Sequence, residues 1–272
     1  MEKISRKSFV KGALGLGAVG ILAGCASSAS STAASASSTA APAEKKEFTF
    51  ADTVRWDAQY DVVVMGMGAA GMVAAKTAAD NGAKVVIVEK CEEGKAGGNT
   101  KVCGQLFAYA NGDKDAAKSY YTALAGGRDI EPEIIDAISE GVANMADILA
   151  DEFGFNKDEY MDWTGVNVGG TNMGAMSPEY PEMPGHEKMA LWTTHAGASD
   201  GYLYQGLKQN VTDRVDAIDV WYSSPAKSLI QDPVTKTVVG VTVERDGKEM
   251  NIRALNGVCI CTGGFECNKE MV

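Results

Sequence analysis

The chain has 272 residues, 45% of them hydrophobic, and a formal net charge of −11. This acidic balance argues against nucleic acid as a partner and against electrostatic docking on anionic lipid. The six cysteines and two histidines show neither Cys-x-x-Cys nor another metal-ligand spacing, so no zinc site, iron–sulfur cluster or attached c-type haem is expected.

Residues 1–25 are predicted to be an export signal. An uncharged stretch at 12–24 follows four basic residues, Lys3, Arg6, Lys7 and Lys11. This stretch is too short to cross a bilayer, which needs about 20 apolar residues, and the pattern is typical of a secretory signal. Removing the signal takes away four basic residues and Glu2, a net of +3, and changes the charge from −11 to about −14.

A lipid anchor is predicted at the end of this signal. Residues 5–11 resemble a twin-arginine export signal in which Lys7 replaces the second arginine. The sequence Leu-Ala-Gly-Cys ending at Cys25 resembles a bacterial lipobox, whose cysteine is lipidated; the alternative is an ordinary cleaved signal with an incidental cysteine. Residues 26–43 are low-complexity Ser/Ala sequence, and we expect a flexible tether over 26–57. An exported bacterial lipoprotein, held at the outer face of the cell membrane through Cys25, is therefore expected.

A strand–turn–helix–strand pattern occupies residues 61–90. The apolar, β-branched run at 61–65 is typical of a buried strand. An Ala-rich helix is predicted over 69–81, ended by Gly82, and a second strand over 84–88. This order predicts an α/β domain with a Rossmann-like parallel sheet, expected to occupy residues 58–272.

The turn within this pattern predicts a dinucleotide site. Gly66, Gly68 and Gly71 form G-x-G-x-x-G: the first permits the tight turn, the second lets a pyrophosphate approach the backbone, and the third lets the helix lie close to the strand. The positive end of the helix then faces the phosphates. Glu89, 21 residues after Gly68, is placed to accept bonds from the ribose hydroxyls. The alternative is a glycine-rich turn in an ordinary α/β unit.

Two further glycine motifs favour FAD over a nicotinamide cofactor. Gly97-Gly98-Asn99-Thr100 follows Glu89 closely, where an extended FAD needs a second backbone approach that NAD does not need. A predicted strand also runs into Thr262-Gly263-Gly264-Phe265. A bare glycine pair after a strand suits another close approach, near the adenosine half of the cofactor.

Together, these motifs resemble the FAD-binding half of the fumarate reductase/succinate dehydrogenase flavoprotein family. The similarity is greatest to its soluble branch of fumarate, urocanate and related enoate reductases, and ketosteroid dehydrogenases share many of the motifs. The resemblance covers roughly residues 58–272. It implies that the pyrophosphate turn consists of Gly66, Gly68, Ala69, Ala70 and Gly71. It further implies a ribose ligand at Glu89 with Lys90 beside it, a flavin-side loop at Gly97, Gly98, Asn99 and Thr100, an adenine contact at Ala226, and a returning strand at Thr262, Gly263 and Gly264.

One departure from the family pattern lies just after the flavin-side loop. The family often carries a small residue and a glycine pair there, whereas this chain has Cys103, Gly104 and Gln105. Gly104 is expected to fill the role of the first glycine. The second position, at Gln105, is left open.

The remaining elements follow the same plan. Helices are predicted over 113–125, after Pro132, and over 200–214. Apolar residues at helical spacing predict a core-facing stripe, made of Ile134, Ile135, Ile138, Val142, Met145 and Leu149. Residues 156–200 are too irregular for an assignment. Strands at 226–231, 238–245 and 249–254 predict a β-meander inserted before the returning strand, with Asp246-Gly247 as a hairpin turn.

The resemblance also implies a reaction. The family's capping domain and catalytic residues come after the point that residues 268–272 match, so the chain is expected to be an incomplete flavoprotein whose catalytic residues are unknown. By resemblance, the whole protein reduces an activated C=C bond of a small carboxylate through hydride transfer from FAD N5, with electrons from a separate donor. The alternatives are a ketosteroid-type dehydrogenase acting on an enone and a non-catalytic, lipid-anchored flavin-binding module.

Overall fold

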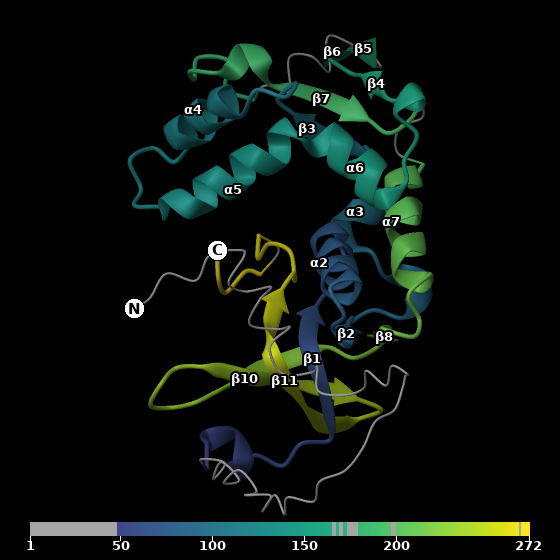
Figure 1. The fold of residues 1–272 in the computed structure, drawn as a ribbon, viewed down its shortest axis with the longest axis vertical. Helices are drawn as coiled ribbons and strands as arrows, with labels where there is room; N and C mark the ends of the chain where they lie inside the picture. Colours follow the sequence, from purple (N-terminus) through teal and green to yellow (C-terminus); the bar gives the residue numbers. More distant parts are fainter. Residues whose placement is uncertain (1–47, 165–166, 169–170, 173–178, 197–199, 267) are drawn as a thin grey trace, which may run out of the picture. The chain divides into compact units, whose positions relative to one another are not determined.

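The computed structural model describes residues 48–164, 167–168, 171–172, 179–196, 200–266 and 268–272 (Figure 1). The predicted export signal, the predicted lipid site at Cys25 and residues 26–47 of the predicted tether lie outside these ranges. The chain forms two compact units: a small one holding residues 48–55 and Asp232–Lys236, and a large one holding Trp56–Gln231 and Thr237–Val272. No helix in the described ranges is long and apolar enough to cross a membrane.

The small unit contains two local structures, each stabilised by an aspartate. In the 3-10 helix η1 (Phe50–Thr53), the Asp52 carboxylate accepts hydrogen bonds of 2.9 Å from both the backbone N–H and the hydroxyl of Thr49. The second local structure is the turn at Asp232–Lys236, where the Asp232 carboxylate accepts from the Val234 N–H at 2.8 Å. Hydrogen bonds from the backbone N–H groups of Val234 and Thr235 hold the pKa of Asp232 below its usual value. A 3-10 helix therefore lies within the last part of the predicted tether at 26–57, because the local capping by Asp52 forms a helical turn.

The large unit contains helices, strands and short 3-10 helices in an α/β order. The helices are α2 (Ala69–Asp80), α3 (Gly98–Val102), α4 (Lys114–Leu124), α5 (Pro132–Ala143), α6 (Met145–Phe153) and α7 (Tyr202–Thr212). The strands are β1 (Ala58–Met65), β2 (Val85–Val88), β3 (Leu106–Tyr109), β4 (Met161–Asp162), β5 (Asn167–Val168), β6 (Thr171–Asn172), β7 (Ala190–Thr193), β8 (Ile218–Trp221), β9 (Ala226–Gln231), β10 (Val238–Arg245) and β11 (Lys248–Ile260). The 3-10 helices are η2 (Glu93–Lys95), η3 (Lys157–Glu159) and η5 (His186–Lys188).

The main sheet has six strands in the order β8-β2-β1-β11-β10-β9. The first four are parallel, and β10 and β9 continue the sheet in antiparallel sense. All four residues of β2 are buried, as expected for an apolar run in a parallel sheet covered on both faces. The prediction of a Rossmann-like α/β fold is confirmed.

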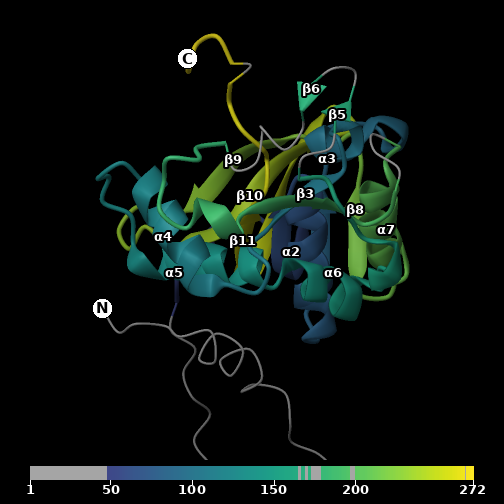
Figure 2. The same ribbon diagram turned by 90° about the horizontal axis from the view of Figure 1, so that it is seen from above.

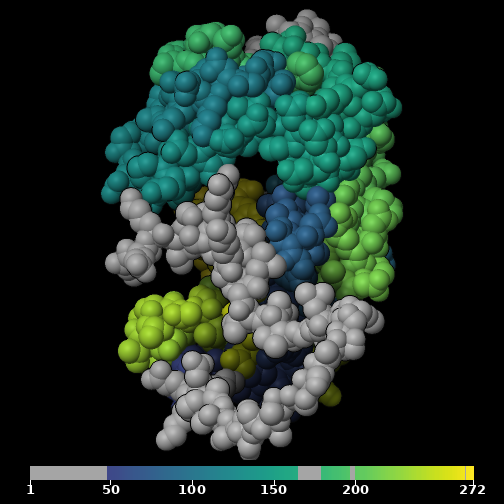
Figure 3. Space-filling model, viewed as in Figure 1, coloured from purple at the N-terminus to yellow at the C-terminus, as the bar shows by residue number. Residues whose placement is uncertain are grey.

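Helices α2 and α7 lie next to each other and cover one face of this sheet (Figures 1 and 2). In Figure 3 the blue surface of α2 adjoins the green surface of α7. Their shared core contains Met72 and Leu207, which are almost fully buried against Val64 of β1 and Ile87 of β2. Burial of these side chains supplies the main favourable term that holds the two helices on the sheet.

On the opposite face, the hairpin of β10 and β11 packs over the start of β1. Val241 and Ile252 are fully buried here together with Val63 of β1. The Tyr60 hydroxyl donates to Asp219 Oδ2 at 2.6 Å, and burial, followed by this hydrogen bond, raises the pKa of Tyr60. A hydrogen-bonded tyrosine at the rim thus closes the apolar layer without leaving a buried polar atom unpaired.

Strand β11 differs from the prediction. The sequence predicts a meander strand at 249–254 and a separate returning strand, but Lys248–Ile260 is one continuous strand. It pairs antiparallel with β10 through its first half and parallel with β1 through its second half. The register shifts where Tyr60 and Val62 face Ala254 and Gly257, and Gly257 has φ +142°. A bulge at this glycine bends the strand instead of interrupting it.

A second layer consists of the antiparallel sheet β3-β7-β4 with α4, α5 and α6. The predicted start of α4 is confirmed, since Asp113 Oδ1 accepts from the Ala116 N–H at 2.9 Å, and Pro132 occupies the first turn of α5. The predicted core stripe is wrong in part. Ile134 and Ile138 are 51% and 42% exposed, because α5 buries the side that carries Ile135, Ser139 and Val142.

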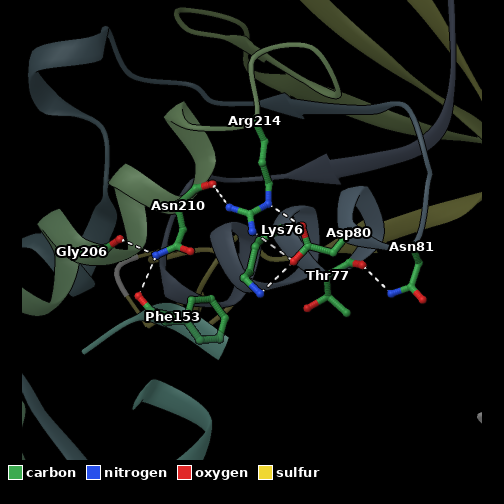
Figure 4. Close-up of polar contacts among 8 residues, drawn as sticks. All are labelled: Lys76, Thr77, Asp80, Asn81, Phe153, Gly206, Asn210 and Arg214. Carbon is green, nitrogen blue, oxygen red and sulfur yellow. Dashed lines mark hydrogen bonds and ion pairs between the residues drawn. The ribbon is translucent and has the colours of Figure 1, made fainter. Parts of the chain in front are cut away.

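A polar cluster joins the last turn of α2 to the end of α7 (Figure 4). Arg214 Nε and Nη2 donate to the two carboxylate oxygens of Asp80 at 2.5 and 3.1 Å, and Lys76 Nζ lies 2.8 Å from Asp80 Oδ2. The Lys76 side chain is only 8% exposed and lies over the Phe153 ring. Hydrogen bonding from Arg214 therefore holds the pKa of the Asp80 carboxyl below its usual value.

Replacing Asp80 tests this cluster. Asp80→Asn is expected to lower the free energy of unfolding by about 1–2 kcal/mol near neutral pH, because a nearly buried Lys76 loses its carboxylate, with a discount for the partial exposure of Asp80. A lowered folded pKa stabilises the fold above the unfolded value, 3.8 for a free carboxyl, and this contribution is lost as pH falls through the folded pKa. Urea midpoints of the parent and the variant should therefore converge in acid.

Asp129→Asn, at an exposed position, serves as the matched control and should leave the midpoint unchanged at each pH. Equal midpoints for the parent and Asp80→Asn near neutral pH would refute the assigned role.

Candidate functional site

The candidate site lies where the carboxyl ends of β1, β2 and β11 meet. Met65 pairs with Val88 on one side and with Ile260 on the other, so the three strands end at the same level. Gly66 then turns the chain with φ +98°, and a Cβ there would lie 2.5 Å from the Cys261 carbonyl oxygen. Ligands of open parallel sheets bind at this edge.

Gly66 and Gly71 are required by the fold itself. A Cβ at Gly71 would lie 1.9 Å from the Gly66 carbonyl oxygen, which no side chain tolerates. Helix α2 can therefore cross β1 at this distance only with glycine at this position. The predicted roles of these two residues in the turn agree with the observed contacts.

Gly68 differs from the other two glycines because no contact within the protein requires a glycine at this position. It begins α2 with an extended conformation, φ −78°, and a Cβ would meet only Thr100 Oγ1 at 3.6 Å and the Gly97 carbonyl oxygen at 4.0 Å. The missing side chain leaves open space in front of the helix. A ligand group that approaches the backbone uses this kind of space.

The amide groups at this end of α2 form an anion cradle. No described residue accepts a hydrogen bond from the N–H groups of Gly68, Ala70 or Gly71. The Ala69 N–H donates to Thr100 Oγ1 at 2.9 Å, and the accepting hydroxyl can still donate its own hydrogen outward. Unpaired amides and the positive end of a 12-residue helix suit the charge of a pyrophosphate.

Glu89 is fixed at the end of β2 beside this turn. It is 6% exposed, and its Oε2 and Oε1 accept from the N–H groups of Met67 at 2.8 Å and Cys91 at 2.9 Å. Each carboxylate oxygen retains a second lone pair for a ligand hydroxyl. Lys90 is exposed and takes no part in these contacts.

The predicted flavin-side loop is brought directly against the turn. Gly97 has φ +119°, Gly98 has φ +53°, and the two begin the short helix α3. A Cβ at Gly97 would lie 2.5 Å from the Tyr204 ring. Asn99 is exposed, and its carbonyl oxygen accepts from the Cys103 N–H at 2.8 Å. Thr100 links this loop to α2, so the two glycine motifs form one site.

The glycine pair expected after this loop is replaced by different chemistry. Gly104 has no left-handed conformation, and a Cβ there would make only ordinary contact with Leu106 at 3.6 Å. Gln105 instead has φ +60° and is 1% exposed. The role of Gln105 was left open, and the one signal in the sequence was a large polar residue where the family resemblance implies a glycine.

The predicted adenosine-side residues reach the same edge of the sheet. The Cys261 N–H donates to the Met65 carbonyl oxygen at 2.9 Å, and Thr262, Gly263 and Gly264 follow as exposed residues. The Ser224 N–H donates to the Glu89 carbonyl oxygen at 2.8 Å, two residues before Ala226 begins β9.

The described residues offer no candidate ligand set for a metal ion. In residues 48–272, apart from the gaps given above, no group of three or more His, Cys, Asp or Glu could hold a metal ion. Cys91, Cys103, Cys259 and Cys261 are free thiols, and burial raises the pKa of Cys259 and Cys261. The two strand cysteines pack against the core beneath the site, as expected of small apolar fillers.

Comparisons with known proteins agree with this geometry. A family model described as FAD binding domain matches residues 61–271. The NADH:fumarate oxidoreductase of Klebsiella pneumoniae (strain 342) is 30% identical over 223 residues, which cover 78% of this chain and 21% of that protein. The 3-oxosteroid 1-dehydrogenase of Comamonas testosteroni is 25% identical over 281 residues, covering 79% and 48%. The solved 3-ketosteroid Δ1-dehydrogenase of Sterolibacterium denitrificans superposes with a TM-score of 0.63 at 20% identity, over 78% of this chain and 49% of that one.

The domain is thus a dinucleotide-binding α/β unit of the flavoprotein type. Because the family match covers most of its residues, the chain belongs to the FAD-binding domain family, and FAD is its cofactor. The similarity to fumarate reductase-type flavoproteins that the motifs predicted is confirmed. The chain spans less than half the length of these relatives.

The residues present fit FAD. The unpaired amides of α2 and the space in front of Gly68 match a pyrophosphate, and the fixed carboxylate of Glu89 matches a ribose. The loop at Gly97 and Gly98 is joined to the turn through Thr100, so a second glycine segment lies beside the cradle. We assign these contacts to the cofactor as expected roles of the named residues.

Two glycine substitutions separate binding from folding. Gly68→Ala should leave the melting temperature within about 2 °C of the parent, because its Cβ meets only ordinary contacts, but should weaken FAD binding at least about tenfold by filling the cradle. Gly71→Ala should prevent folding. Flavin fluorescence titration and circular dichroism measure the two effects.

Gly141→Ala, in open space on α5, is the control and should bind FAD as the parent does. Unchanged FAD affinity in a folded Gly68→Ala variant would contradict the assignment of the cradle.

Proposed function

We propose that this chain is the FAD-binding part of an exported oxidoreductase that reduces an activated C=C bond of a small carboxylate. The observation that carries the proposal is the cradle of α2, Glu89 and the Gly97–Thr100 loop, which fits an extended dinucleotide. The 30% identity to an NADH:fumarate oxidoreductase supports the choice of substrate class.

The chain's own residues hold and orient the cofactor in this proposal. The amides of Gly68 and Ala70 bind the pyrophosphate, Glu89 accepts bonds from the ribose, and Gly98 leaves backbone open on the flavin side. FAD, when bound, supplies hydride transfer to and from carbon. The proposal names no catalytic residue in this chain, and a separate redox carrier is proposed as the electron donor.

A ketosteroid-type dehydrogenase is the second candidate. The 3-oxosteroid 1-dehydrogenase relative, of which the match covers 48%, favours it. That reaction runs in the oxidative sense and acts on an enone precursor, so an assay can distinguish the two directions. A third alternative is a flavin-binding module without catalysis.

The reaction is tested in both directions with the whole FAD-loaded protein of which this chain is proposed to be the FAD-binding part. We expect fumarate, urocanate or a related enoate to reoxidise reduced methyl viologen, and no such oxidation with Gly68→Ala. Dye reduction by a 3-ketosteroid, without viologen oxidation, would establish the second candidate instead. FAD binding without turnover in either assay would favour the non-catalytic module.

We also propose that the chain is an exported lipoprotein anchored through Cys25, on the strength of the signal and lipobox pattern. Expressed in a bacterial host with an alkyne-labelled fatty acid, the parent should carry the label and sediment with membranes. Cys25→Ser should lose the label and leave the membrane fraction. Cys103→Ser, an exposed cysteine elsewhere, should behave as the parent does. Equal labelling of the parent and Cys25→Ser would exclude this anchor.

A further inference from the structure

The later part of the flavin-side loop, at Thr100 and Cys103, is held by one buried side chain. Gln105 is 1% exposed, and its Nε2 donates to the carbonyl oxygens of Thr100 at 2.9 Å and Cys103 at 3.1 Å. Its Oε1 accepts from the Tyr204 N–H at 3.2 Å. The amide therefore joins the middle and the C-terminal cap of α3 to the first turn of α7.

Tyr204 holds the beginning of the same loop, at Ala96 and Gly97. It is 5% exposed, its hydroxyl donates to the Ala96 carbonyl oxygen at 3.1 Å, and its ring occupies the space beside Gly97. A side chain at Gly97 would lie within 2.5 Å of that ring, so the ring and the glycine conformation depend on each other.

The backbone of Gln105 indicates that its side chain is kept for these bonds. Its φ of +60° lies in the left-handed region, where glycine is favoured and a glutamine is strained. Glycine would relieve this strain but would leave the Thr100 and Cys103 carbonyl groups without the amide. The cost of this strained backbone is explained if the bonds of the Gln105 side chain are needed to hold the flavin-side loop in place.

The flavin-side loop is in turn bonded to the cofactor cradle through Thr100. Thr100, whose carbonyl oxygen is held by Gln105, accepts through Oγ1 from the Ala69 N–H at the start of α2. Contacts thus run without a break from α7 through Gln105 to Thr100 and the pyrophosphate turn.

We propose that Gln105 and Tyr204 are positioning residues for FAD, which act by holding residues 97–103 in the conformation that binds the cofactor. Neither side chain needs to touch FAD itself. The proposal rests on FAD binding and not on the proposed reaction.

The test uses the full chain and three single variants. Gln105→Gly, which relieves the strained φ and removes the side-chain bonds to Thr100, Cys103 and Tyr204, should raise the Kd for FAD roughly tenfold or more in a fluorescence titration. Tyr204→Phe keeps the ring and loses only the bond to Ala96, so a rise of roughly two- to threefold is expected. Gln209→Ala, exposed on α7, is the matched control and should bind FAD as the parent does.

Two readouts separate positioning from general stability. Visible circular dichroism of the bound flavin should change in Gln105→Gly, and hydrogen exchange of amides 97–103 in the ligand-free chain should accelerate while α4 stays protected. A lower melting temperature with unchanged Kd and unchanged flavin dichroism would overturn the proposal. A parent chain that binds no FAD would overturn it together with the cofactor contacts, whereas failure of the reductase assay alone would leave it standing.

Discussion

The close crossing of helix α2 over strand β1 is the constraint on which the site depends. A Cβ at Gly71 would lie 1.9 Å from the Gly66 carbonyl oxygen, so the crossing exists only because Gly71 lacks a side chain. It brings the first amides of α2 to the level where β1, β2 and β11 end. Gly66 also lies against Cys261, so the same turn fixes the end of β11. The cradle is therefore a consequence of backbone packing before any ligand contact is made.

Two polar side chains, Glu89 and Thr100, complete the cradle by accepting hydrogen bonds from backbone N–H groups, and these bonds fix its shape. Glu89 holds two amides from separate segments, and Thr100 accepts the Ala69 N–H. The far end of α2 is tied to α7 through Asp80 and Arg214. Helix α7 thus contacts both the last turn of α2 and, through Tyr204, the flavin-side loop. One helix sets the position of the two halves of the site, which is the basis for the role inferred for Gln105.

Local patterns predicted well wherever the stabilising interactions are themselves local. The β1–α2–β2 unit, the cap at Asp113 and the first-turn position of Pro132 depend on neighbours within a few residues, and the structure agrees with them. Helical spacing predicted a core face that includes Ile134 and Ile138, but both are exposed. Spacing shows which residues share a face, and only the neighbours of a helix decide whether that face is covered. For a similar reason the prediction separated the strand at 249–254 from the returning strand, whereas pairing with β1 carries β11 through the bulge.

By itself, the sequence determined the class of cofactor, because a phosphate cradle needs glycines at particular spacings and those spacings are visible in the chain. It also determined the α/β order of the elements around that cradle. Only the tertiary structure decided which glycines the fold requires and which one leaves room for a ligand, since that depends on atoms of distant segments such as Cys261 and Thr100. It also decided the place of Gln105, whose buried amide finds its partners in residues 100, 103 and 204, an arrangement that exists only after α3 and α7 have packed together.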